Sequence, residues 1–582
     1  MWKNWKAVVR DAIRRASRTP PGSETRACSH KGNLGTWESQ SSPCVKSGVG
    51  VPTVAVKTPG AERKLEPLRR AFHEKGTQRK TSDARYRGRR GRTERPRDGL
   101  LAVLADHSTD GWEHGVSSRE GGEPESRGTH CREGEAGHHV NLEGPMGDTP
   151  RSPTVSMKLQ RVAQQAQRYP EMVFNNVSHL IDCEFLLEAY RQTRKSSAPG
   201  VDKVTAKQYA DNLDANLRDL HERLRENRYI APPAERVWIE KEDGKKRPIS
   251  KPCFEDKIVQ RAVVMILEAI FEHDFHAFSH GFRKKHSPHQ ALNDLREQCR
   301  KLKINWIIDA DVSGFFDNLD RSHLRAFITQ RVNDGGILRL IGKWEGAGVM
   351  EDGVLYHPET GVMQGSVISP VLANVYLHQV LDDWFVRDVQ PRMKGRCFLI
   401  RFADDFVVGF ELEEDAHRVM EVLPKRFGRF SLTIHPEKTV LLEFKKPSSR
   451  EHSAKGKGTF DFLGFTHYWA KTRRGYWVIK RKTVGKRLRR FIKGIWVWCR
   501  EYRHDPLTEQ HRTLCSKLRG YYQYYGIRGN FKGLEVVFKH TEHAWRYWLS
   551  RRSHKGQMNW QKFVQSVGKK LPLPKPRIIH NI

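Results

Sequence analysis

Hydrophobic residues are spread unevenly along this chain of 582 residues. Residues 1–150 contain only 19 Leu, Ile, Val and Phe, about 13%, and follow neither the period of a strand nor that of a helix. So few apolar side chains cannot bury enough area to offset the entropy of ordering the backbone. We expect a disordered, basic and glycine-rich extension over residues 1–156. It either grips RNA or precedes the true translation start, at Met146 or Met157.

Regular patterns begin near Met157. Segments 183–195 and 209–229 have Leu at helical spacing and predict helices. Short apolar runs of strand length then occur between 235 and 470 among longer helical runs, which predicts an α+β fold. Residues 471–582 hold 28 Lys and Arg against 5 Asp and Glu, with 17 aromatic residues, and are expected to be helical and strongly basic.

Composition narrows the class of partner. The excess of 103 Lys and Arg over 68 Asp and Glu gives a net charge of +35, which favours a polyanionic partner such as nucleic acid. No apolar run approaches the roughly 20 residues that span a bilayer, and no signal peptide is evident, so we expect no membrane partner. The nine cysteines form no C-x-x-C pair, which argues against a zinc ribbon and favours a reducing cytoplasmic location, on the nucleoid when the protein binds DNA.

Paired aspartates stand out among the strand-like runs. Two such runs flank Asp404 and Asp405, and an earlier run ends at Asp309 and Asp311. Adjacent carboxylates repel each other, so they persist when they are solvated at a turn, protonated, or neutralised by a cation. Oxygen ligands of this kind suit Mg²⁺, and two such ions can promote phosphoryl transfer. On these residues alone, a solvated hairpin turn and a metal site both remain open.

The order of motifs resembles the reverse transcriptases encoded by group II introns, over about 174–582. The blocks that carry the resemblance are APGVD (198–202), KEDGKKRPISKP (241–252), DKIVQRA (256–262), SHGFRKKHSPHQAL (279–292), DADVSGFFDNLD (309–320), GVMQGSVISPVLANVYL (361–377), RFADDF (401–406), LTIHPEKT (432–439) and FDFLGF (460–465). The resemblance implies a right-hand polymerase with fingers, palm and thumb. It further implies a helical, basic maturase region joined to the thumb.

The same resemblance assigns roles to individual residues. Asp311, Asp404 and Asp405 become the catalytic ligands of two Mg²⁺ ions, with Asp309 a neighbour and Phe316 a gate against the 2′-hydroxyl. The implied nucleotide-binding residues are Lys241, Arg247, Phe316, Gln364, Gly365 and Lys438, and the implied primer grip is Leu463 and Gly464.

Each of these motifs also has a plainer explanation. Lys241 and Arg247 flank a turn at Gly244 that can be a solvated basic hairpin, and Gln364-Gly365 can be an ordinary turn before a helix starting near Ser369. The small Gly365 would let the backbone approach the templating base pair. Lys438 can be a surface lysine instead of a counter-charge for phosphate, and Gly464 can mark a strand bulge.

The basic C-terminal region contains the expected RNA-binding residues Lys482, Lys486, Arg487, Arg490, Tyr521 and Tyr522. The cations recur at near-helical spacing and could follow phosphates, while the tyrosine rings could stack on unpaired bases. Core packing is the alternative for half of the tyrosines in 521–525, and it is the expected role of Trp545 and Trp548.

The expected domains are the extension (1–156), an N-terminal region with the fingers (157–300), the palm (301–470), the thumb and maturase region (471–550) and a tail (551–582). Three features depart from the family pattern, and one is Lys284-Lys285-His286 in place of a more usual Pro-containing stretch. Phe402 stands where most relatives have Tyr, and no H-N-H nuclease motif with paired cysteines follows the thumb. We therefore expect no such endonuclease and a DNA primer from another source, such as a replication fork.

We expect an RNA-directed DNA polymerase that also acts as a maturase in splicing and mobility of its intron. Its partners would be the intron RNA, an RNA template, a DNA primer or target, and dNTPs. A reverse transcriptase without an intron, for example in phage defence, and a splicing-only RNA-binding factor are the alternatives. An RNA-dependent RNA polymerase is disfavoured by Phe316.

Overall fold

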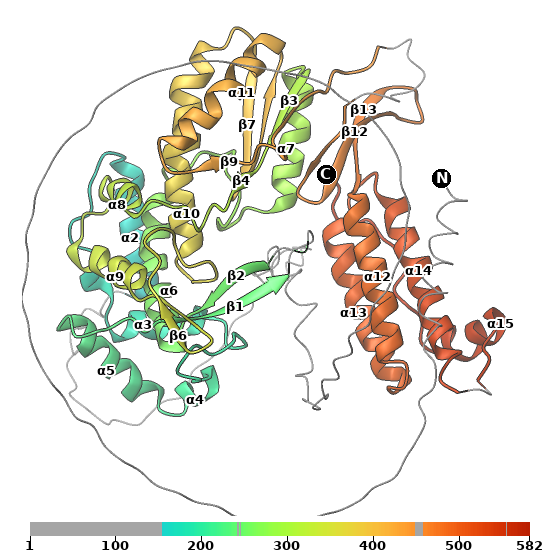
Figure 1. The fold of residues 1–582 in the computed structure, drawn as a ribbon, viewed down its shortest axis with the longest axis horizontal. Coiled ribbons are helices and arrows are strands. Elements are labelled where there is room, and N and C mark those ends of the chain that lie inside the picture. Colours follow the sequence, from blue (N-terminus) through green and yellow to red (C-terminus); the bar gives the residue numbers. More distant parts are fainter. Residues whose placement is uncertain (1–153, 241–243, 245, 449–457, 554–555) are drawn as a thin grey trace, which may run out of the picture. The chain divides into compact units, whose positions relative to one another are not determined.

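The computed structural model describes residues 154–582, except for 241–243, 245, 449–457 and 554–555 (Figure 1). Helix α2 (Val155–Arg168) comes first, and the Thr154 hydroxyl accepts a hydrogen bond from the backbone N–H of Met157 at 3.4 Å. Such a cap satisfies a donor that the helix itself leaves unpaired. Regular structure thus begins at Val155, two residues before the expected boundary at 157. Residues 1–153 of the expected extension lie outside the described part of the chain.

Helix α6 (Phe254–Phe271) is central to the N-terminal helices. Fourteen of its eighteen residues are buried, and a helix buried on all sides must be enclosed by other elements. Helices α2 and α3 pack against it. The buried carboxylate of Asp256 accepts hydrogen bonds from Trp344 Nε1 at 2.7 Å and from Gln260 Nε2 at 2.8 Å. The neighbouring helices are α3 (Cys183–Gln192), α4 (Ala206–Ala210) and α5 (Leu213–Arg225).

A small mixed sheet follows α5 and has the strand order β2-β1-β5-β6. Strands β1 and β2 form an antiparallel hairpin in which Glu240 pairs with Lys246, and Gly244 has φ +79° between them. The expected hairpin around Gly244 is therefore present. The four strands are β1 (Ala234–Glu240), β2 (Lys246–Lys251), β5 (Val349–Glu351) and β6 (Val354–Tyr356).

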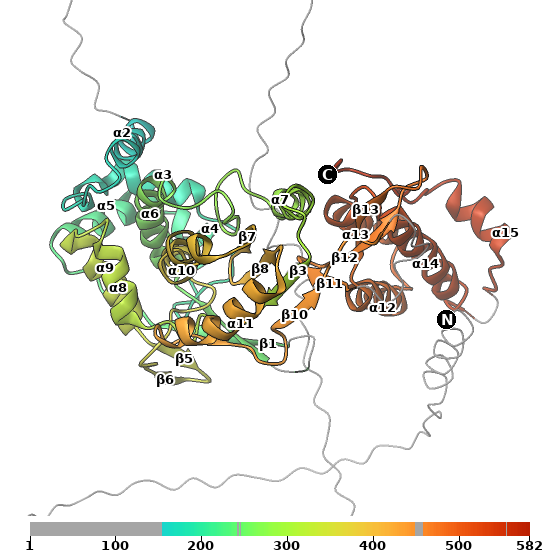
Figure 2. The ribbon, with the colours of Figure 1, turned by 90° about the horizontal axis from the view of Figure 1, so that it is seen from above.

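An antiparallel sheet with the order β10-β3-β8-β7 lies at the centre of the described structure. Its strands are β3 (Trp306–Ala310), β7 (Cys397–Phe402), β8 (Asp405–Phe410) and β10 (Val440–Glu443). Figure 2 shows α11 (Glu413–Gly428) and α7 (Pro288–Lys301) on opposite sides of this sheet. Alternate residues such as Ile308 and Ile307 enter separate hydrophobic cores, so both faces are covered. Strands β4 (Val312–Ser313) and β9 (Thr433–Ile434) form a short second pair.

Three α-helices lie between β4 and β7 along the chain. These are α8 (Arg321–Thr329), α9 (Gly335–Gly346) and α10 (Ser369–Leu377). Helix α10 begins at Ser369, as expected, and runs into a π-helical segment, His378–Asp382, with a second one at Phe385–Val389. The first π-helical segment lies close to the paired aspartates through Asp382, as described below.

The C-terminal region combines a three-stranded sheet, in the order β11-β12-β13, with helices. The strands are β11 (Phe460–Phe462), β12 (Phe465–Lys471) and β13 (Trp477–Thr483), and the helices are α12 (Gly485–Glu501), α13 (Leu507–Tyr525), α14 (Phe531–Leu549) and α15 (Trp560–Phe563). Trp545 is buried in the core of these helices, as expected, and Trp548 packs against it.

The strands of the central and C-terminal sheets pair antiparallel and helices pack around them, which confirms the α+β class. Among the described helices, none combines the length and the apolar character that crossing a bilayer requires.

Candidate active site

A tight turn joins β7 to β8 and carries Asp404 and Asp405. Phe402 pairs with Asp405 across the hairpin, and Ala403 takes the left-handed conformation, with φ 58°. Gly281 lies against this turn, because a Cβ there would be 2.1 Å from the backbone nitrogen of Ala403. Only glycine leaves room for the turn at this point.

Asp309 and Asp405 project from the same face of the central sheet. Ala310 pairs with Phe406, and side chains alternate along each strand, so both neighbours of that pair point to the other face. Asp311 follows two residues after Asp309, and its backbone N–H donates to Thr439 Oγ1 at 3.3 Å. The two aspartate pairs therefore meet where β3 ends and β8 begins, at one end of the inner strands.

Repulsion between the aspartates contributes to the raised pKa values of Asp404 and Asp405. Burial is the main cause that raises the pKa of Asp404, and the charge of Asp311 adds to it. The pKa of Asp405 is raised well above its ordinary value by burial, then by the charges of Asp309, Asp404 and Asp311. These side chains thus interact strongly enough to hinder one another's ionisation.

A fifth carboxylate belongs to the group, and sequence reasoning missed it. Asp461 lies on β11, which contacts β3, and its charge raises the pKa of Asp309. Burial contributes most, and together with Asp461 and Asp311 it brings the pKa of Asp309 to about 7. Asp309 therefore belongs to the group of interacting carboxylates, whereas the sequence predicted only that it would lie beside the metal ligands. A cation placed among the carboxylates would relieve their repulsion.

Two basic side chains approach the carboxylates from different elements. Lys438 Nζ donates a hydrogen bond to Asp311 Oδ2, and the His435 N–H, from the same loop, donates to the Asp311 carbonyl oxygen at 2.8 Å. Arg247, on β2, lowers the pKa of Asp404 against the effect of burial. Lys241 lies outside the described residues.

Gln364 and Gly365 lie against strand β2. The Ser250 N–H donates to the Gln364 carbonyl oxygen at 2.7 Å. Gly365 has φ +102°, and a Cβ there would be 2.6 Å from the Ser250 carbonyl oxygen. The glycine is needed for contact with the chain's own strand, a reason that differs from the expected approach to a templating pair.

Phe316 belongs to the turn that follows β4. Its half-buried ring meets Phe315 edge-on, with centroids 5.2 Å apart, and its carbonyl oxygen accepts from the Val362 N–H at 2.8 Å. Phe316 is thus attached to the same loop that contains Gln364 and Gly365. The loop and the turn together place three of the expected nucleotide-binding residues near one another.

Leu463 and Gly464 form the two-residue turn between β11 and β12, with φ of 48° and 79°. Gly464 therefore belongs to the turn of this hairpin and does not mark a strand bulge. The Leu463 carbonyl oxygen accepts from Tyr524 Oη at 2.9 Å, and a Cβ on Gly464 would be 3.3 Å from Arg487 Nη1. The charge of Arg487 in turn acts on Asp405, so the expected primer grip and one expected RNA-binding residue lie close to the carboxylates.

The prediction that Tyr521 and Tyr522 bind RNA is wrong. Their exposed fractions are 5% and 1%, and both enter the core between the C-terminal helices. The Tyr521 ring packs on Phe491 with centroids 4.4 Å apart, and Tyr522 Oη donates to the Pro574 carbonyl oxygen at 3.2 Å. Burial of the rings leaves no face for a base.

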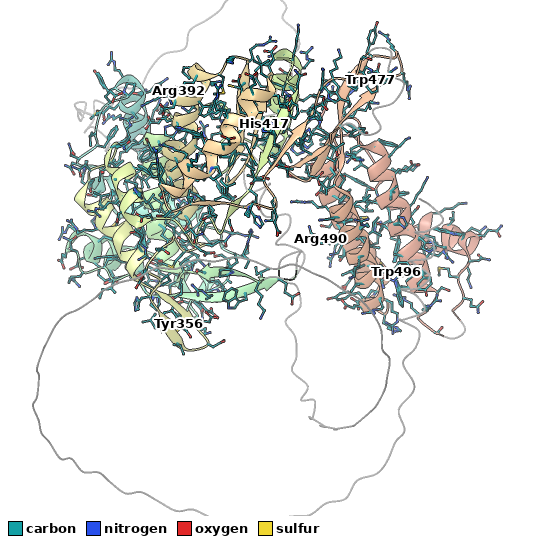
Figure 3. All side chains as sticks on the ribbon, turned by 45° about the horizontal axis from the view of Figure 1, so that its top comes forward. Tyr356, Arg392, His417, Trp477, Arg490 and Trp496 are labelled. Atoms are coloured by element: carbon teal, nitrogen blue, oxygen red, sulfur yellow. The ribbon has the colours of Figure 1, made fainter. Side chains whose placement is uncertain are left out.

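The four cations expected to bind RNA are exposed or half-exposed, unlike the two buried tyrosines. Lys482, Lys486 and Arg487 are exposed, and Arg490 is half-exposed. Figure 3 labels Arg490 and Trp496, which both belong to α12. The Lys482 ammonium lies 5.1 Å from the centre of the Tyr468 ring. Exposure keeps these cations available to an anionic partner.

Parts of the chain are similar in sequence to a reverse transcriptase family and to intron-encoded proteins. Residues 239–467 match the family model of reverse transcriptase (RNA-dependent DNA polymerase). Over 286 residues the chain is 35% identical to Protein YkfC of Escherichia coli, a match that covers 44% of this chain and 75% of that protein. Over 304 residues it is 32% identical to the group II intron-encoded protein LtrA of Lactococcus lactis, covering 51% of this chain and 48% of that protein. Nuclear intron maturase 1 of Arabidopsis thaliana is 30% identical over 122 residues, 20% of this chain and 17% of that protein.

Proposed function

Because the chain belongs to the family of reverse transcriptases and maturases encoded by group II introns, we propose that it copies RNA into DNA and assists its intron RNA. The family uses divalent metal ions and acts with RNA and DNA. The specific proposal is that Asp311, Asp404 and Asp405 are the catalytic residues. Asp309 and Asp461 would support them from the same group of carboxylates.

The donor set suits a divalent cation. It consists of half-buried carboxylates, and burial followed by the charges of neighbouring aspartates raises the pKa of Asp404 and Asp405. Hard oxygen ligands of this kind are those that Mg²⁺ prefers. We propose that Asp311, Asp404 and Asp405 would hold two Mg²⁺ ions. When bound, these ions would stabilise the attacking and leaving oxygens of nucleotide transfer.

Basic side chains would neutralise the phosphate charge of the substrate. Arg247, together with Lys241, would offset the charge of an incoming dNTP from the β1-β2 hairpin. Lys438 would exchange its contact with Asp311 for the transferred phosphate, either as a counter-charge or as an acid.

Shape selects the substrate. The Phe316 ring would exclude a ribose 2′-hydroxyl, while Gln364 and Gly365, anchored to β2, would line the nascent base pair. Leu463 and Gly464 would position the primer strand, with Arg487 nearby to contact its phosphates. With these roles, the separate motifs would act together at the same carboxylates.

The domain plan follows from this arrangement. Residues 157–300 would supply the fingers, 301–470 the palm, 471–550 the thumb and maturase region, and 551–582 a tail. The β1-β2 hairpin, the central sheet and the bundle of α12 to α14 support these three parts in turn. The exposed cations of β13 and α12 would contact the intron RNA, and in a bacterial host the complex would work in the cytoplasm on nucleoid DNA.

One observation carries the proposal, namely the group of carboxylates from β3, the β7-β8 turn and β11 whose charges act on one another. Replacing Asp404 and Asp405 by Asn keeps the side-chain shape and removes the charge. Losing several kcal/mol of charge stabilisation should slow primer extension on an RNA template by roughly 1000-fold.

The matched control is Asp317→Asn, because Asp317 is exposed in the turn beside Phe316. It should leave primer extension unchanged, and all variants should keep their affinity for RNA. Primer extension by the double Asn variant at close to the rate of the unaltered protein would contradict the assignment. Splicing of the intron RNA, measured beside it, would separate the maturase role from the polymerase.

A further inference from the structure

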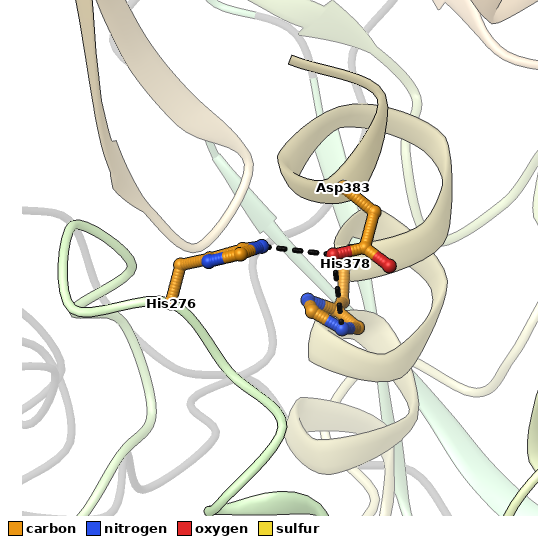
Figure 4. A group of neighbouring side chains, drawn as sticks. All are labelled: His276, His378 and Asp383. Atoms are coloured by element: carbon orange, nitrogen blue, oxygen red, sulfur yellow. Dashed lines mark hydrogen bonds and ion pairs between the residues drawn. The ribbon is translucent and has the colours of Figure 1, made fainter. Parts of the chain in front are cut away.

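A second group of metal-binding side chains lies away from the paired aspartates. His276, His378 and Asp383 each direct a donor atom to one point, and these atoms lie within 4.8 Å of one another (Figure 4). His276 Nε2 is 2.8 Å from Asp383 Oδ1, and His378 Nε2 is 3.5 Å from the same oxygen. Two imidazoles thus converge on one carboxylate oxygen.

An unusual backbone brings the donors together. The π-helical segment His378–Asp382 closes with a hydrogen bond from the Asp383 N–H to the His378 carbonyl oxygen, so residues five apart lie one above the other. An ordinary α-helix would turn Asp383 away from His378. Such π-helical insertions occur often at functional sites. The His276 loop is held in place by Arg283 Nη1, which donates to the His276 carbonyl oxygen at 2.7 Å.

Burial leaves part of this group unsatisfied. The His378 side chain is 8% exposed, and its Nδ1 has no hydrogen-bond partner among the described residues. The side chains of Asp383 and His276 are 13% and 28% exposed. This Nδ1 faces Asp382 Oδ2 at 3.9 Å, so the nitrogen that a ligand could use is Nε2, whose distance of 3.5 Å from Asp383 Oδ1 is longer than a normal hydrogen bond.

We propose that His276, His378 and Asp383 bind a transition-metal ion of the zinc class, with water as a fourth ligand on the side where His276 is exposed. Ligands 2.0–2.1 Å from a tetrahedral ion are about 3.3 Å apart, between the two distances found here. Imidazole with carboxylate suits Zn²⁺, Co²⁺ or Ni²⁺ better than Mg²⁺. The site is therefore chemically distinct from the catalytic carboxylates.

Such an ion would stabilise the β7-β8 turn through the residues that contact Arg401. Asp382, beside Asp383, forms a buried ion pair with Arg401, which precedes the β7-β8 turn. Phe278, two residues after His276, accepts from the Arg401 N–H through its carbonyl oxygen at 2.9 Å. One ion would thus fasten both segments that hold Arg401 in place.

The test uses full-length protein stripped of metal with a chelator. Titration with Co²⁺ should give the visible absorption of a tetrahedral complex at one equivalent, and Zn²⁺ should displace it. Asp383→Asn and His276→Gln should each weaken Co²⁺ binding at least ~10-fold, the lower range seen for lost supporting groups at metal sites. His276 is the half-exposed ligand, so its variant is expected to fold.

His417→Gln is the control, because His417 is an exposed histidine of α11 whose Nε2 lies 3.7 Å from Glu413 without a third donor among the described residues (Figure 3). It should bind Co²⁺ as the unaltered protein does. Absence of the tetrahedral absorption, or equal binding by the Asp383→Asn and His276→Gln variants, would reduce the group to a hydrogen-bonded triad. The double Asn variant at Asp404 and Asp405 should retain the cobalt absorption, which keeps this test separate from that of the polymerase.

Discussion

Arg401 and Asp382 form an ion pair whose side chains are both fully buried. Arg401 Nε lies 2.8 Å from Asp382 Oδ1 and Nη2 lies 2.6 Å from Oδ2, so the guanidinium and the carboxylate meet edge to edge. Arg401 Nη1 also donates to the Ala403 carbonyl oxygen at 3.1 Å. The pair therefore links the π-helical segment after α10 to the turn that carries Asp404.

Removing one partner should destabilise the protein strongly. Asp382→Ala leaves the Arg401 charge buried without its counter-charge, which costs about 3–5 kcal/mol in comparable sites. Asp388→Ala is the matched control, since Asp388 and Arg392 are 3.6 Å apart and exposed, where an ion pair contributes about 1 kcal/mol or less. Urea unfolding measures both. Equal losses of unfolding free energy would show that burial of the Arg401 pair has no special effect.

Gly365→Ala should impair polymerisation more than stability alone explains. The added Cβ would collide with the Ser250 carbonyl oxygen and push β2, and with it Arg247, away from Asp404. Gly353→Ala has the same kind of backbone strain, at φ +85°, but meets no atom within 4 Å. Each left-handed Ala should cost about 1–2 kcal/mol of stability.

Comparing the two glycine variants separates the effect of backbone strain from the effect of displacing β2. Only Gly365→Ala should lower kcat/KM for dNTP incorporation, measured by single-nucleotide extension at a temperature where both variants are folded. If Gly353→Ala loses as much kcat/KM, the contact with β2 does not position Arg247.

The grouping of the paired aspartates could be predicted because their signal is local. Asp404 and Asp405 sit between two apolar strands, and the chemistry of adjacent carboxylates already limits what they can do. Asp461 gave no such signal, since it reads as the polar position of a short strand, Phe460–Phe462. Its charge matters only because β11 contacts β3, a pairing between distant segments that periodicity does not encode.

The tyrosines of α13 show the converse difficulty. A run of aromatic residues on a basic helix fits both a stacking surface and a core, and the choice depends on how many helices surround it. Residues of α12, α13 and α14 share one hydrophobic core, and Tyr521 and Tyr522 point into it. The cations of α12 remain outside, because burying an unpaired charge costs far more than leaving it in water.

His467 should make the protein sensitive to acid. The ring is fully buried, stacks on Phe460 with centroids 4.8 Å apart, and its nitrogens have no partner among the described residues. Burial, with a smaller contribution from the charge of Arg481, lowers its pKa from 6.5 to about 3. Below pH 6.5 the unfolded chain binds a proton that the folded chain does not, so stability falls as the pH falls from 6.5 towards 3.

His467→Phe should flatten this dependence. The slope of unfolding free energy against pH in that window should decrease by up to about 1.4 kcal/mol per pH unit, because one titrating group is removed. Urea unfolding at pH 5 and pH 6 measures the change. His417→Phe, at an exposed histidine, should leave the slope as it was. An unchanged slope in His467→Phe would mean that the buried ring does not govern the acid response.

Reversing charges beside α12 should weaken RNA binding and its dependence on salt. Each cation that neutralises a phosphate contributes roughly 0.7–0.9 to the slope of log K against log salt concentration, so Lys482→Glu with Lys486→Glu should lower the slope by about 1.5. Lys539→Glu is the control, because Lys539 is an exposed cation of α14, 2.8 Å from Glu535. RNA titrations at several salt concentrations give the slopes. If Lys539→Glu lowers the slope as much per charge, the effect reflects net charge alone, and β13 and the start of α12 hold no specific phosphate contacts.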